Sequence, residues 1–390
     1  MYLEQPKRQS SLLRILLLIA LVAAGVYILN RTGEPGSAVT PTPAPTRTAA
    51  SYVADAQLAV QAGRLNEAVL ALKVALTLEP DNPAIAPSLV RLMIYQSEGR
   101  KERKTEVLRV AQRAARSMPD SAPVQAALAL ALDWNDQTLD AINAGKLATQ
   151  LDPNYAEGFA FLSEAYTDGQ NWARALEGAE TAIRLNPGSI DAHRTMGYYL
   201  ESRGRFGEAL TAYQRAVALA PNTAFLYMLL ARNYRALGNF DAAIKQYERT
   251  LELEPNRGDA LDDAGWTHYL TFQAYSRQSD LETAIKELEK ATTLSPDYAS
   301  AWAHMGIAYW SRRNYEDAIP ALQRAIDLGA NKIEYFYILG LAHFYMGQCD
   351  KAMPLFQKAL VLDPNDVNAQ GGVNLCLGVT ATPLPATRKP

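Results

Sequence analysis

The chain has too few cysteines, histidines and clustered basic residues for several common classes of protein. Its 390 residues include two cysteines and four histidines, and the formal net charge is −3. Two cysteines cannot build a disulfide scaffold or a four-ligand zinc site. No stripe of lysine and arginine dominates, so no nucleic-acid partner is expected. The remaining composition, 48% hydrophobic and 20% charged, is that of a globular or repeat protein.

Sequence signals for catalysis and for cofactors are also missing. The four histidines stand far apart, and neither a Cys-x-x-Cys nor a His-x-x-x-His pair occurs. There is no glycine-rich phosphate loop, and no serine stands in a nucleophile-elbow context. We therefore expect a protein without enzyme activity, without a cofactor and without a metal site.

One long apolar run lies near the N-terminus, at residues 12–30. It reads LLRILLLIALVAAGVYILN, and its 19 residues approach the ~20 that cross a bilayer as a helix. Lys7, Arg8 and Arg14 lie on its N-terminal side, against Arg31 on the other. This positive-inside bias predicts a transmembrane signal anchor in the lipid bilayer, with a short cytoplasmic segment at residues 1–11.

A cleaved signal peptide is the alternative to this anchor. Val22-Ala23-Ala24 is a tolerable cleavage sequence. The apolar run continues beyond it to Leu29, however, which is longer than a typical signal core. The uncleaved anchor is therefore favoured, and it places the rest of the chain outside the cytoplasm.

Proline and threonine dominate the stretch that follows, at residues 31–50. A segment of this composition cannot bury a core and favours extended conformations, so it is expected to be a linker. The C-terminal residues 379–390 have the same character and are expected to be a disordered tail.

Between the linker and the tail, the sequence repeats with a fixed period. Four consecutive proline gaps, from Pro119 to Pro255, are each 34 residues long, and the gap from Pro296 to Pro364 is two such periods. A proline follows the end of a helical pattern in nearly every period, at Pro80, Pro119, Pro153, Pro187, Pro221, Pro255, Pro296 and Pro364. The period indicates a repeat of two helices.

The pattern inside each period resembles the tetratricopeptide repeat. Trp302, Met305, Gly306 and Tyr309 stand at helical spacing, with a small residue where two helices would cross. A glycine that suits a left-handed helix end recurs at one repeat position, at Gly63, Gly204, Gly238 and Gly347. The resemblance covers residues 51–378. It implies an all-α, right-handed superhelical solenoid of about nine helical hairpins with a C-terminal capping helix.

Two repeats depart from this length. The second spans 39 residues and carries a charged insert at Ser97–Glu106, and the seventh spans 41 with extra residues at Thr271–Asp280. Both insertions are expected at hairpin turns, where they would form protrusions on one edge. After Pro364, residues 366–377 are expected to form the helix that covers the last hairpin.

The family resemblance also implies a binding surface. In tetratricopeptide proteins the first helix of each hairpin lines a concave groove that holds a partner's segment. The matching positions in this chain are Phe161, Arg194, Tyr198, Phe225, Arg232, Asp259, Asp262, Asp263, Trp266, Tyr269, His304, Trp310, Tyr337, Phe344 and Tyr345. Aromatic residues beside three aspartates suit an extended protein segment with apolar and basic side chains. Alternatively, some of these aromatic side chains fill the inside of the superhelix.

The two cysteines fall on neighbouring parts of the implied solenoid. Cys349 would start the second helix of the ninth hairpin and Cys376 would lie late in the capping helix. Tetratricopeptide stacking places those two ends on one edge, so a disulfide between them is expected outside the cytoplasm. The alternative is a pair of buried thiols.

These features together favour a membrane-anchored, extracytoplasmic scaffold of a bacterial type. It would bind partner segments in its groove or help to assemble an envelope complex. The alternative is a structural subunit of a homo-oligomer or of a larger membrane complex, which would use the edges or the convex face of the array.

Overall fold

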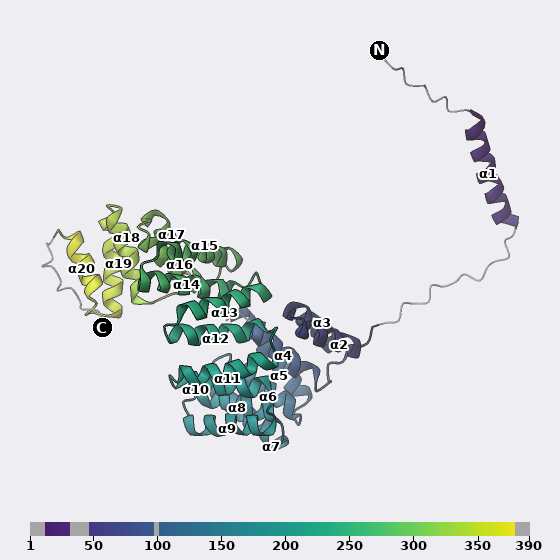
Figure 1. Ribbon diagram of the computed structural model, residues 1–390, viewed down its shortest axis with the longest axis horizontal. Coiled ribbons are helices and arrows are strands. Elements are labelled where there is room, and N and C mark those ends of the chain that lie inside the picture. The colour runs from purple at the N-terminus through teal and green to yellow at the C-terminus, as the bar shows by residue number, and fades with distance from the viewer. Residues whose placement is uncertain (1–11, 32–46, 97–100, 379–390) are drawn as a thin grey trace, which may run out of the picture. The chain divides into compact units, whose positions relative to one another are not determined.

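The protein is described here by a computed structural model that covers residues 12–31, 47–96 and 101–378. These residues form 20 helices, and no strand occurs among them. The chain divides into two units, residues 1–47 and 48–390 (Figure 1). The predicted cytoplasmic segment 1–11, most of the predicted linker 31–50 and the predicted tail 379–390 lie outside the described residues.

The first unit contains one helix, α1 (Leu12–Arg31), at the position predicted for the membrane anchor. In the part of the chain that the structure describes, no helix combines the length and the apolar character needed to cross a membrane. The transmembrane helix predicted at residues 12–30 is therefore not confirmed.

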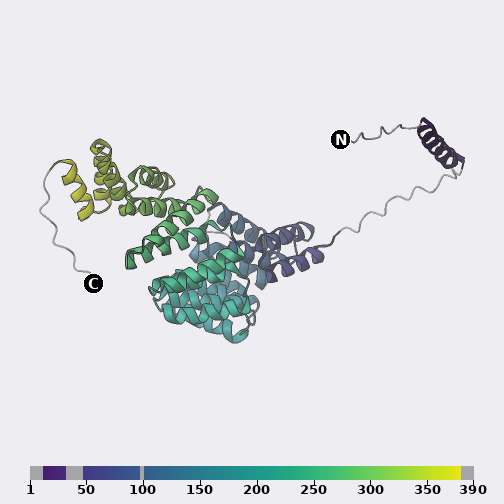
Figure 2. The same ribbon diagram turned by 45° about the horizontal axis from the view of Figure 1, so that its top comes forward.

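The second unit is a curved row of antiparallel helix pairs (Figure 2). Its first half consists of α2 (Ala49–Gln61) with α3 (Leu65–Leu78), α4 (Ile85–Gln96) with α5 (Lys101–Ser117), α6 (Ala122–Asp133) with α7 (Thr138–Leu151), α8 (Ala156–Asp168) with α9 (Trp172–Leu185), and α10 (Ile190–Ser202) with α11 (Phe206–Leu219). Its second half consists of α12 (Ala224–Ala236) with α13 (Phe240–Leu253), α14 (Gly258–Tyr275) with α15 (Gln278–Leu294), α16 (Ala299–Ser311) with α17 (Tyr315–Asp327), α18 (Ile333–Tyr345) with α19 (Cys349–Leu362), and the capping helix α20 (Val367–Cys376). The all-helical solenoid expected from the sequence is confirmed.

A left-handed residue ends the turn inside most pairs. Gly63, Gly204, Gly238 and Gly347 have φ between +70° and +75°, as their shared repeat position predicts. Where glycine is missing, other residues adopt the same conformation, with φ from +55° to +63° at Asp136, Gln170 and Arg313. The geometry of the connection therefore imposes this conformation whatever residue occupies the position.

The residue after the turn caps the second helix of several pairs. Asn171, Asn239 and Asn314 each accept a hydrogen bond from the backbone N–H three residues later. Such caps satisfy one of the free N–H groups at a helix start. Each turn thus ends one helix and begins the next within a few residues.

Small residues let the two helices of a pair approach closely. A Cβ added at Gly340 of α18 would lie 2.6 Å from the ring of Phe356 in α19. The Phe356 ring is fully buried and also lies against Gly372 of α20. The glycines therefore make room for a large apolar side chain that joins the last pair to the capping helix.

The described parts of the two predicted insertions are mostly helical. In the second repeat, residues 97–100 of the predicted insert lie outside the described residues, whereas residues 101–106 belong to α5, and Glu106 binds Lys73 of α3 with Oε1 and Nζ 2.7 Å apart. In the seventh, α14 and α15 have 18 and 17 residues, and only Ser276 and Arg277 separate them. Thr271 is fully buried in α14, and its hydroxyl donates a hydrogen bond to the Thr267 carbonyl, so the predicted loop protrusion of the seventh repeat is wrong.

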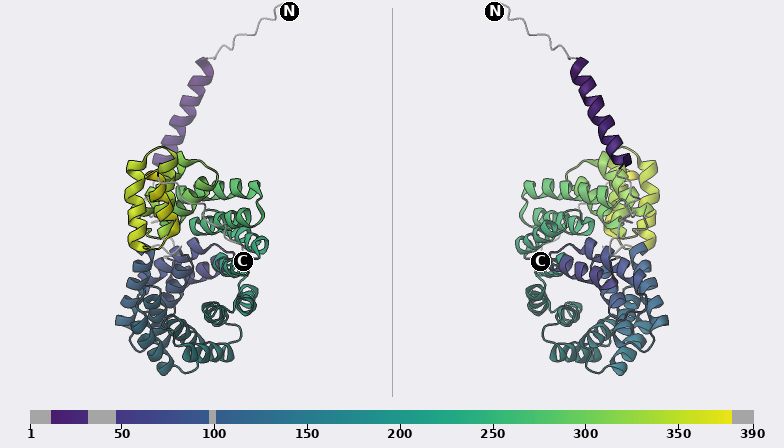
Figure 3. Two further views of the ribbon diagram at one scale, coloured as in Figure 1. Left: turned by 90° about the vertical axis from the view of Figure 1, so that its left-hand side faces the viewer. Right: turned by 90° about the vertical axis from the view of Figure 1, so that its right-hand side faces the viewer.

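The row of pairs curves until its beginning meets its middle. In Figure 3 the blue helices at the start of the array come round beside the green helices. The Asn222 side chain, before α12, donates to the Gln61 carbonyl at the end of α2 at 2.7 Å. The Arg257 side chain, before α14, donates to the Tyr95 carbonyl in α4 at 3.1 Å. Helices α2 to α14 therefore form a closed turn, which we call the ring.

Candidate functional site

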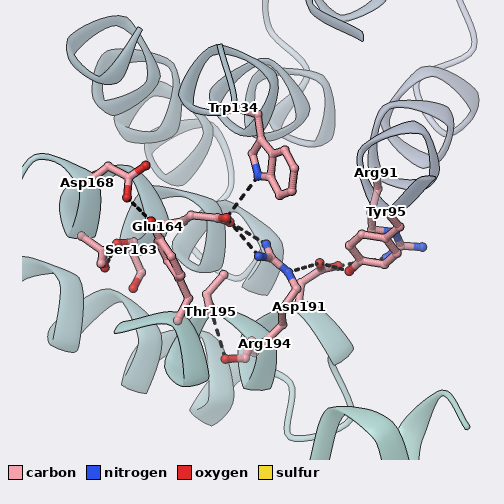
Figure 4. Close-up of polar contacts among 12 residues, drawn as sticks. Arg91, Tyr95, Trp134, Ser163, Glu164, Asp168, Asp191, Arg194 and Thr195 are labelled. Atoms are coloured by element: carbon pink, nitrogen blue, oxygen red, sulfur yellow. Dashed lines mark hydrogen bonds and ion pairs between the residues drawn. The ribbon is translucent and has the colours of Figure 1, made fainter. Parts of the chain in front are cut away.

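A buried network of polar side chains lies in the ring, on helices that are the first of their pairs (Figure 4). Arg194 of α10 is at its centre and donates from Nη1 and Nη2 to the two carboxylate oxygens of Glu164 in α8, at 3.0 and 2.5 Å. The Trp134 indole donates to the same carboxylate at 3.2 Å. Arg194 and Glu164 are 3% and 4% exposed. Burial lowers the pKa of Arg194, but Glu164, Tyr95 and Asp191 together raise it well above its usual value. The network therefore holds a hydrogen-bonded arginine–glutamate pair inside the ring.

The same network carries the closure of the ring. Asp191 of α10 is fully buried and accepts hydrogen bonds from the Tyr95 hydroxyl and from Arg91 Nη1, the latter at 3.1 Å. The Tyr95 ring also stacks on Phe225 of α12, with ring centres 5.1 Å apart. Phe225 was predicted to face a partner, and it instead packs against the second repeat of its own chain.

Beside this network lies a cavity of about 260 Å³, which we call the acidic cavity. Helices α6, α8, α10 and α12 supply most of its lining, and Arg194, Tyr198, Phe225 and Arg232 are among the lining residues. Its five carboxylates outnumber its three basic side chains. The carboxylates are those of Asp133, Asp136, Glu164, Asp168 and Glu201, and the basic residues are Lys104, Arg194 and Arg232.

Asp133 is the most unusual residue of the acidic cavity. It is 3% exposed, and its Oδ1 atom accepts no hydrogen bond from any described residue. Burial, together with Glu164 and Asp168, raises its pKa to about 9. Asp133 is therefore protonated at neutral pH when the cavity holds no ligand.

The three aspartates predicted to attract a basic segment already have partners. Asp259 binds Arg257, with Oδ1 and Nε 2.9 Å apart, and Asp262 Oδ1 lies 2.7 Å from Nδ1 of His304. Asp263 binds Arg232 and Arg235, which outweigh the effect of burial and hold its pKa below the usual value. Each of the three carboxylates therefore has a partner within the chain, and the predicted acidic binding surface is not confirmed.

Several predicted groove aromatics also belong to the core. Phe161 is 4% exposed, and Tyr269 is 9% exposed with its hydroxyl 3.1 Å from that of Ser311. The Trp266 ring is stacked between Tyr269 and His304, with ring centres 4.8 and 4.1 Å away. Tyr337 is partly buried against the apolar side chains of the last pairs. These aromatic side chains therefore pack inside the superhelix, which is the alternative that the sequence left open.

The remaining predicted aromatics form an accessible row across the last two pairs. Tyr345 of α18 is 56% exposed, and its ring stacks on Tyr315 of α17 with ring centres 5.0 Å apart. Trp310 of α16 contacts both rings, at 5.2 and 5.7 Å, and Phe344 meets Tyr345 edge to face at 5.4 Å. We call these four residues the aromatic row. Tyr315 lies outside the predicted set because it belongs to a second helix.

The structure joins Cys349 and Cys376 in a disulfide. Their Cα atoms are 5.5 Å apart, at the start of α19 and the end of α20. The bridge therefore fastens the capping helix to the last pair.

The sequence contained a signal for the cavity residues that the prediction missed. Asp133 and Trp134 stand 34 residues before Thr167 and Asp168, at two positions that line the groove in the family. Arg91 and Tyr95 had no comparable signal, because the second repeat lacks the small-residue pattern of the others.

The antiparallel pairs, the shared left-handed turn and the capping helix define a helical-repeat solenoid. Family profiles described as tetratricopeptide repeat match residues 190–256, 269–333 and 333–366. The resemblance found in the sequence for residues 51–378 is therefore confirmed over these three stretches. The comparison with curated proteins finds no match.

Solved structures share the fold at low sequence identity. PilF of Pseudomonas aeruginosa is 16% identical with a TM-score of 0.50, over 56% of this chain and 96% of PilF. The human IFIT1 dimer with m7Gppp-AAAA is 16% identical with a TM-score of 0.53, over 85% and 81% of the two chains. The Cut9–Hcn1 hetero-tetramer of APC/C is 16% identical with a TM-score of 0.50, over 84% and 76%. At these identities the likeness concerns the fold alone.

Proposed function

We propose that the chain is a non-catalytic protein-binding scaffold and that its aromatic row contacts the partner. The observation that carries this proposal is the exposure of Tyr345, a large ring held in place by Tyr315 and Trp310. Rigid aromatic side chains supply much of the binding energy at protein interfaces, because they bury a large area and lose little freedom. The fold supports the same function, since tetratricopeptide repeats suit protein–protein contacts.

The chemistry of the row favours an apolar segment of the partner. Its four members are Trp310, Tyr315, Phe344 and Tyr345. The aspartates expected to select basic side chains are bound to partners within the chain, so we do not expect them to select a basic segment. The row therefore suits aliphatic or aromatic side chains of a partner protein, and we do not expect it to bind nucleic acid.

The proposal places the array outside the cytoplasm, as part of an envelope complex. The disulfide between Cys349 and Cys376 supports this, because such bonds persist in oxidising compartments and are rare in the cytosol. Protease treatment of intact cells, followed by membrane extraction, tests the location. Digestion of the array only after lysis would contradict it.

Membrane association through residues 12–30 stays a prediction from the sequence, and the same extraction tests it.

Cross-linking in cells tests the aromatic row directly. The full chain is compared with the Trp310→Ala/Tyr345→Ala variant, and Tyr275→Ala is the matched control because Tyr275 is equally exposed at 57% but lies outside the row. We expect a defined partner protein to be cross-linked by the native chain and the control and to be lost from the double variant. Equal recovery of the partner by all three chains would reject the row as the binding surface.

A second candidate function is that of a structural subunit of a homo-oligomer. On α3, Leu70, Val74 and Leu78 are four residues apart and 64%, 41% and 48% exposed. Such a stripe on the first pair is where an array would pack against a second copy. Light scattering of the native chain and of Leu70→Lys separates the two functions. A dimer that Leu70→Lys dissociates would favour the structural subunit, whereas a monomer would reject it.

A further inference from the structure

The acidic cavity contains a buried carboxyl group with one oxygen atom that accepts no hydrogen bond from the described residues. Glu164 is bound by Arg194, and Glu201 accepts hydrogen bonds from Tyr213 and Asn233 at 2.7 and 3.0 Å. Among the carboxylates of the acidic cavity, Asp133 alone combines almost complete burial with an oxygen atom that accepts no hydrogen bond from a described group. Buried polar atoms without partners are rare, and each one indicates an unseen partner or a functional role.

The charges around Asp133 make a positively charged partner the favourable one. The charged groups that face it are Glu164 and Asp168 from α8, Asp136 from the following turn and Arg194 from α10. Arg194 is already bound to Glu164, and Arg232 is bound to Asp263. Burial raises the pKa of Asp168, and Lys104, from α5, lies close enough to oppose that rise. The uncompensated charge in the cavity is therefore negative.

The size and the walls of the cavity favour an organic cation. Its volume of about 260 Å³ exceeds the needs of a bare metal ion and is below the ~300–1,000 Å³ of pockets for drug-sized ligands. The lining includes the aromatic residues Trp134, Tyr198, Tyr213 and Phe225. Aromatic faces attract ammonium and guanidinium groups, whereas a phosphate would be repelled by the carboxylates.

We propose that the acidic cavity binds an alkylammonium or guanidinium group, which donates a hydrogen bond to Asp133 and packs against Trp134. The group can belong to a small free amine or to a lysine or arginine side chain of a protein. This site lies on α6 to α12 and is separate from the aromatic row on α16 to α18. The proposal for one site can therefore be rejected without affecting the proposal for the other.

Binding is expected to release a proton. Because Asp133 is protonated in the free chain, a cation that pairs with its carboxylate displaces that proton into solvent. A role of Asp133 in folding alone would not link proton release to a ligand.

Isothermal titration calorimetry of the full chain tests the proposal with three probes. Agmatine represents a free small cation, N-acetyl-arginine amide represents a protein side chain, and N-acetyl-citrulline amide is its neutral isostere. Titrations at pH 7 in phosphate and in Tris, which differ in ionisation heat, count the protons released. We expect at least one cationic probe to bind with release of up to about one proton and the citrulline compound not to bind.

The variants Asp133→Asn and Asp140→Asn make the test specific. Asp133→Asn keeps the shape of the side chain, and we expect it to weaken cation binding at least tenfold and to abolish proton release. Asp140→Asn removes an exposed carboxylate of α7 outside the cavity and should bind like the native chain. Binding of agmatine alone would identify a small amine, and binding of the arginine amide would identify a side chain. Absence of binding by both cations, or equal binding of the citrulline compound, would overturn the proposal.

Discussion

Arg257 Nη1 donates a hydrogen bond to the backbone carbonyl of Tyr95, 3.1 Å away and 162 residues earlier in the chain. The same guanidinium binds Asp259 and Glu254, with nitrogen–oxygen distances of 2.9 Å to each, and Arg257 is only 3% exposed. One side chain therefore fastens the start of α14 to the end of α4.

Replacement of Arg257 by alanine should open the ring. It removes the bond to Tyr95 and leaves Asp259 buried without its cation, which costs about 3–5 kcal/mol for a broken buried pair. Urea unfolding measures the loss, and hydrogen exchange in α4 locates it. Arg205→Ala, which removes an exposed ion pair with Glu208, is the control. It should change neither the free energy of unfolding nor the hydrogen exchange of α4. Unchanged exchange in α4 would contradict the role of Arg257 in closure.

Removing Arg194 alone should lower the free energy of unfolding more than replacing both Arg194 and Glu164 by apolar residues. Arg194→Met leaves a buried carboxylate without its partner and should destabilise the chain by about 3–5 kcal/mol. Arg194→Met combined with Glu164→Leu should recover most of that loss, because two apolar side chains need no partner. A double-mutant cycle by denaturant unfolding measures the coupling. Additive losses would show that the two residues do not act as a pair.

Asp133→Asn should change how stability depends on pH. The folded chain holds the Asp133 proton up to a pKa of about 9, whereas the usual value is 3.8, so the unfolded chain loses it first. The free energy of unfolding therefore falls as pH rises between these values, and the asparagine variant lacks this fall. We expect the variant to be more stable than the native chain at pH 8 by roughly 1–3 kcal/mol. Parallel stability curves from pH 4 to 9 would reject this assignment.

A methyl group at Gly340 should be harmful, although alanine favours helix. It would lie 2.6 Å from Phe356, which Gly372 confines from the other side, so overpacking should cost about 1–3 kcal/mol. Gly207→Ala is the matched control, because a Cβ there has no neighbour within 4 Å and should stabilise α11 by up to ~1 kcal/mol. Thermal unfolding compares the two. A stabilising Gly340→Ala would show that Phe356 can move aside.

Loss of the disulfide should loosen only the end of the array. Cys349 and Cys376 are separated by 27 residues, and closing such a loop contributes ~3 kcal/mol in the chain-entropy model. The Cys349→Ser/Cys376→Ser variant should therefore exchange its amide hydrogens in α20 faster, with no change in α8 or α10. Native protein treated with a reducing agent is the control and should match the variant. Equal protection of α20 in all samples would contradict a stabilising bridge.

The sequence predicted the helix pairs well because a fixed period defines them. Gly204 and Gly238 adopt the left-handed turn for the same reason that they recur, and the resemblance to tetratricopeptide repeats placed Cys349 and Cys376 on one edge. The period does not predict which side chains meet between pairs. Arg232 and Arg235 both reach Asp263, a contact that depends on the rotation from one pair to the next. An acidic cluster in the sequence therefore became a set of internal ion pairs.

The closure of the ring could not be predicted from any single repeat. Each pair adds a small rotation, and only their sum decides whether α4 meets α10 and α14. Arg91 and Tyr95 also lie in the least regular repeat, so no repeat position marked them as contact residues. The acidic cavity follows from the same sum, because it exists only where α6, α8, α10 and α12 are held together.

The contacts of Arg257 and Asn222 have a mechanical consequence. An array whose pairs touch only their neighbours behaves as a spring that bends and stretches along its length. Here α2 to α14 are tied across the turn, so extension of that part must first break bonds between residues more than 160 positions apart. We therefore expect the array to bend and stretch mainly in the helices from α15 onward. The aromatic row lies in this more flexible part of the array, whereas the acidic cavity lies in the stiffer ring.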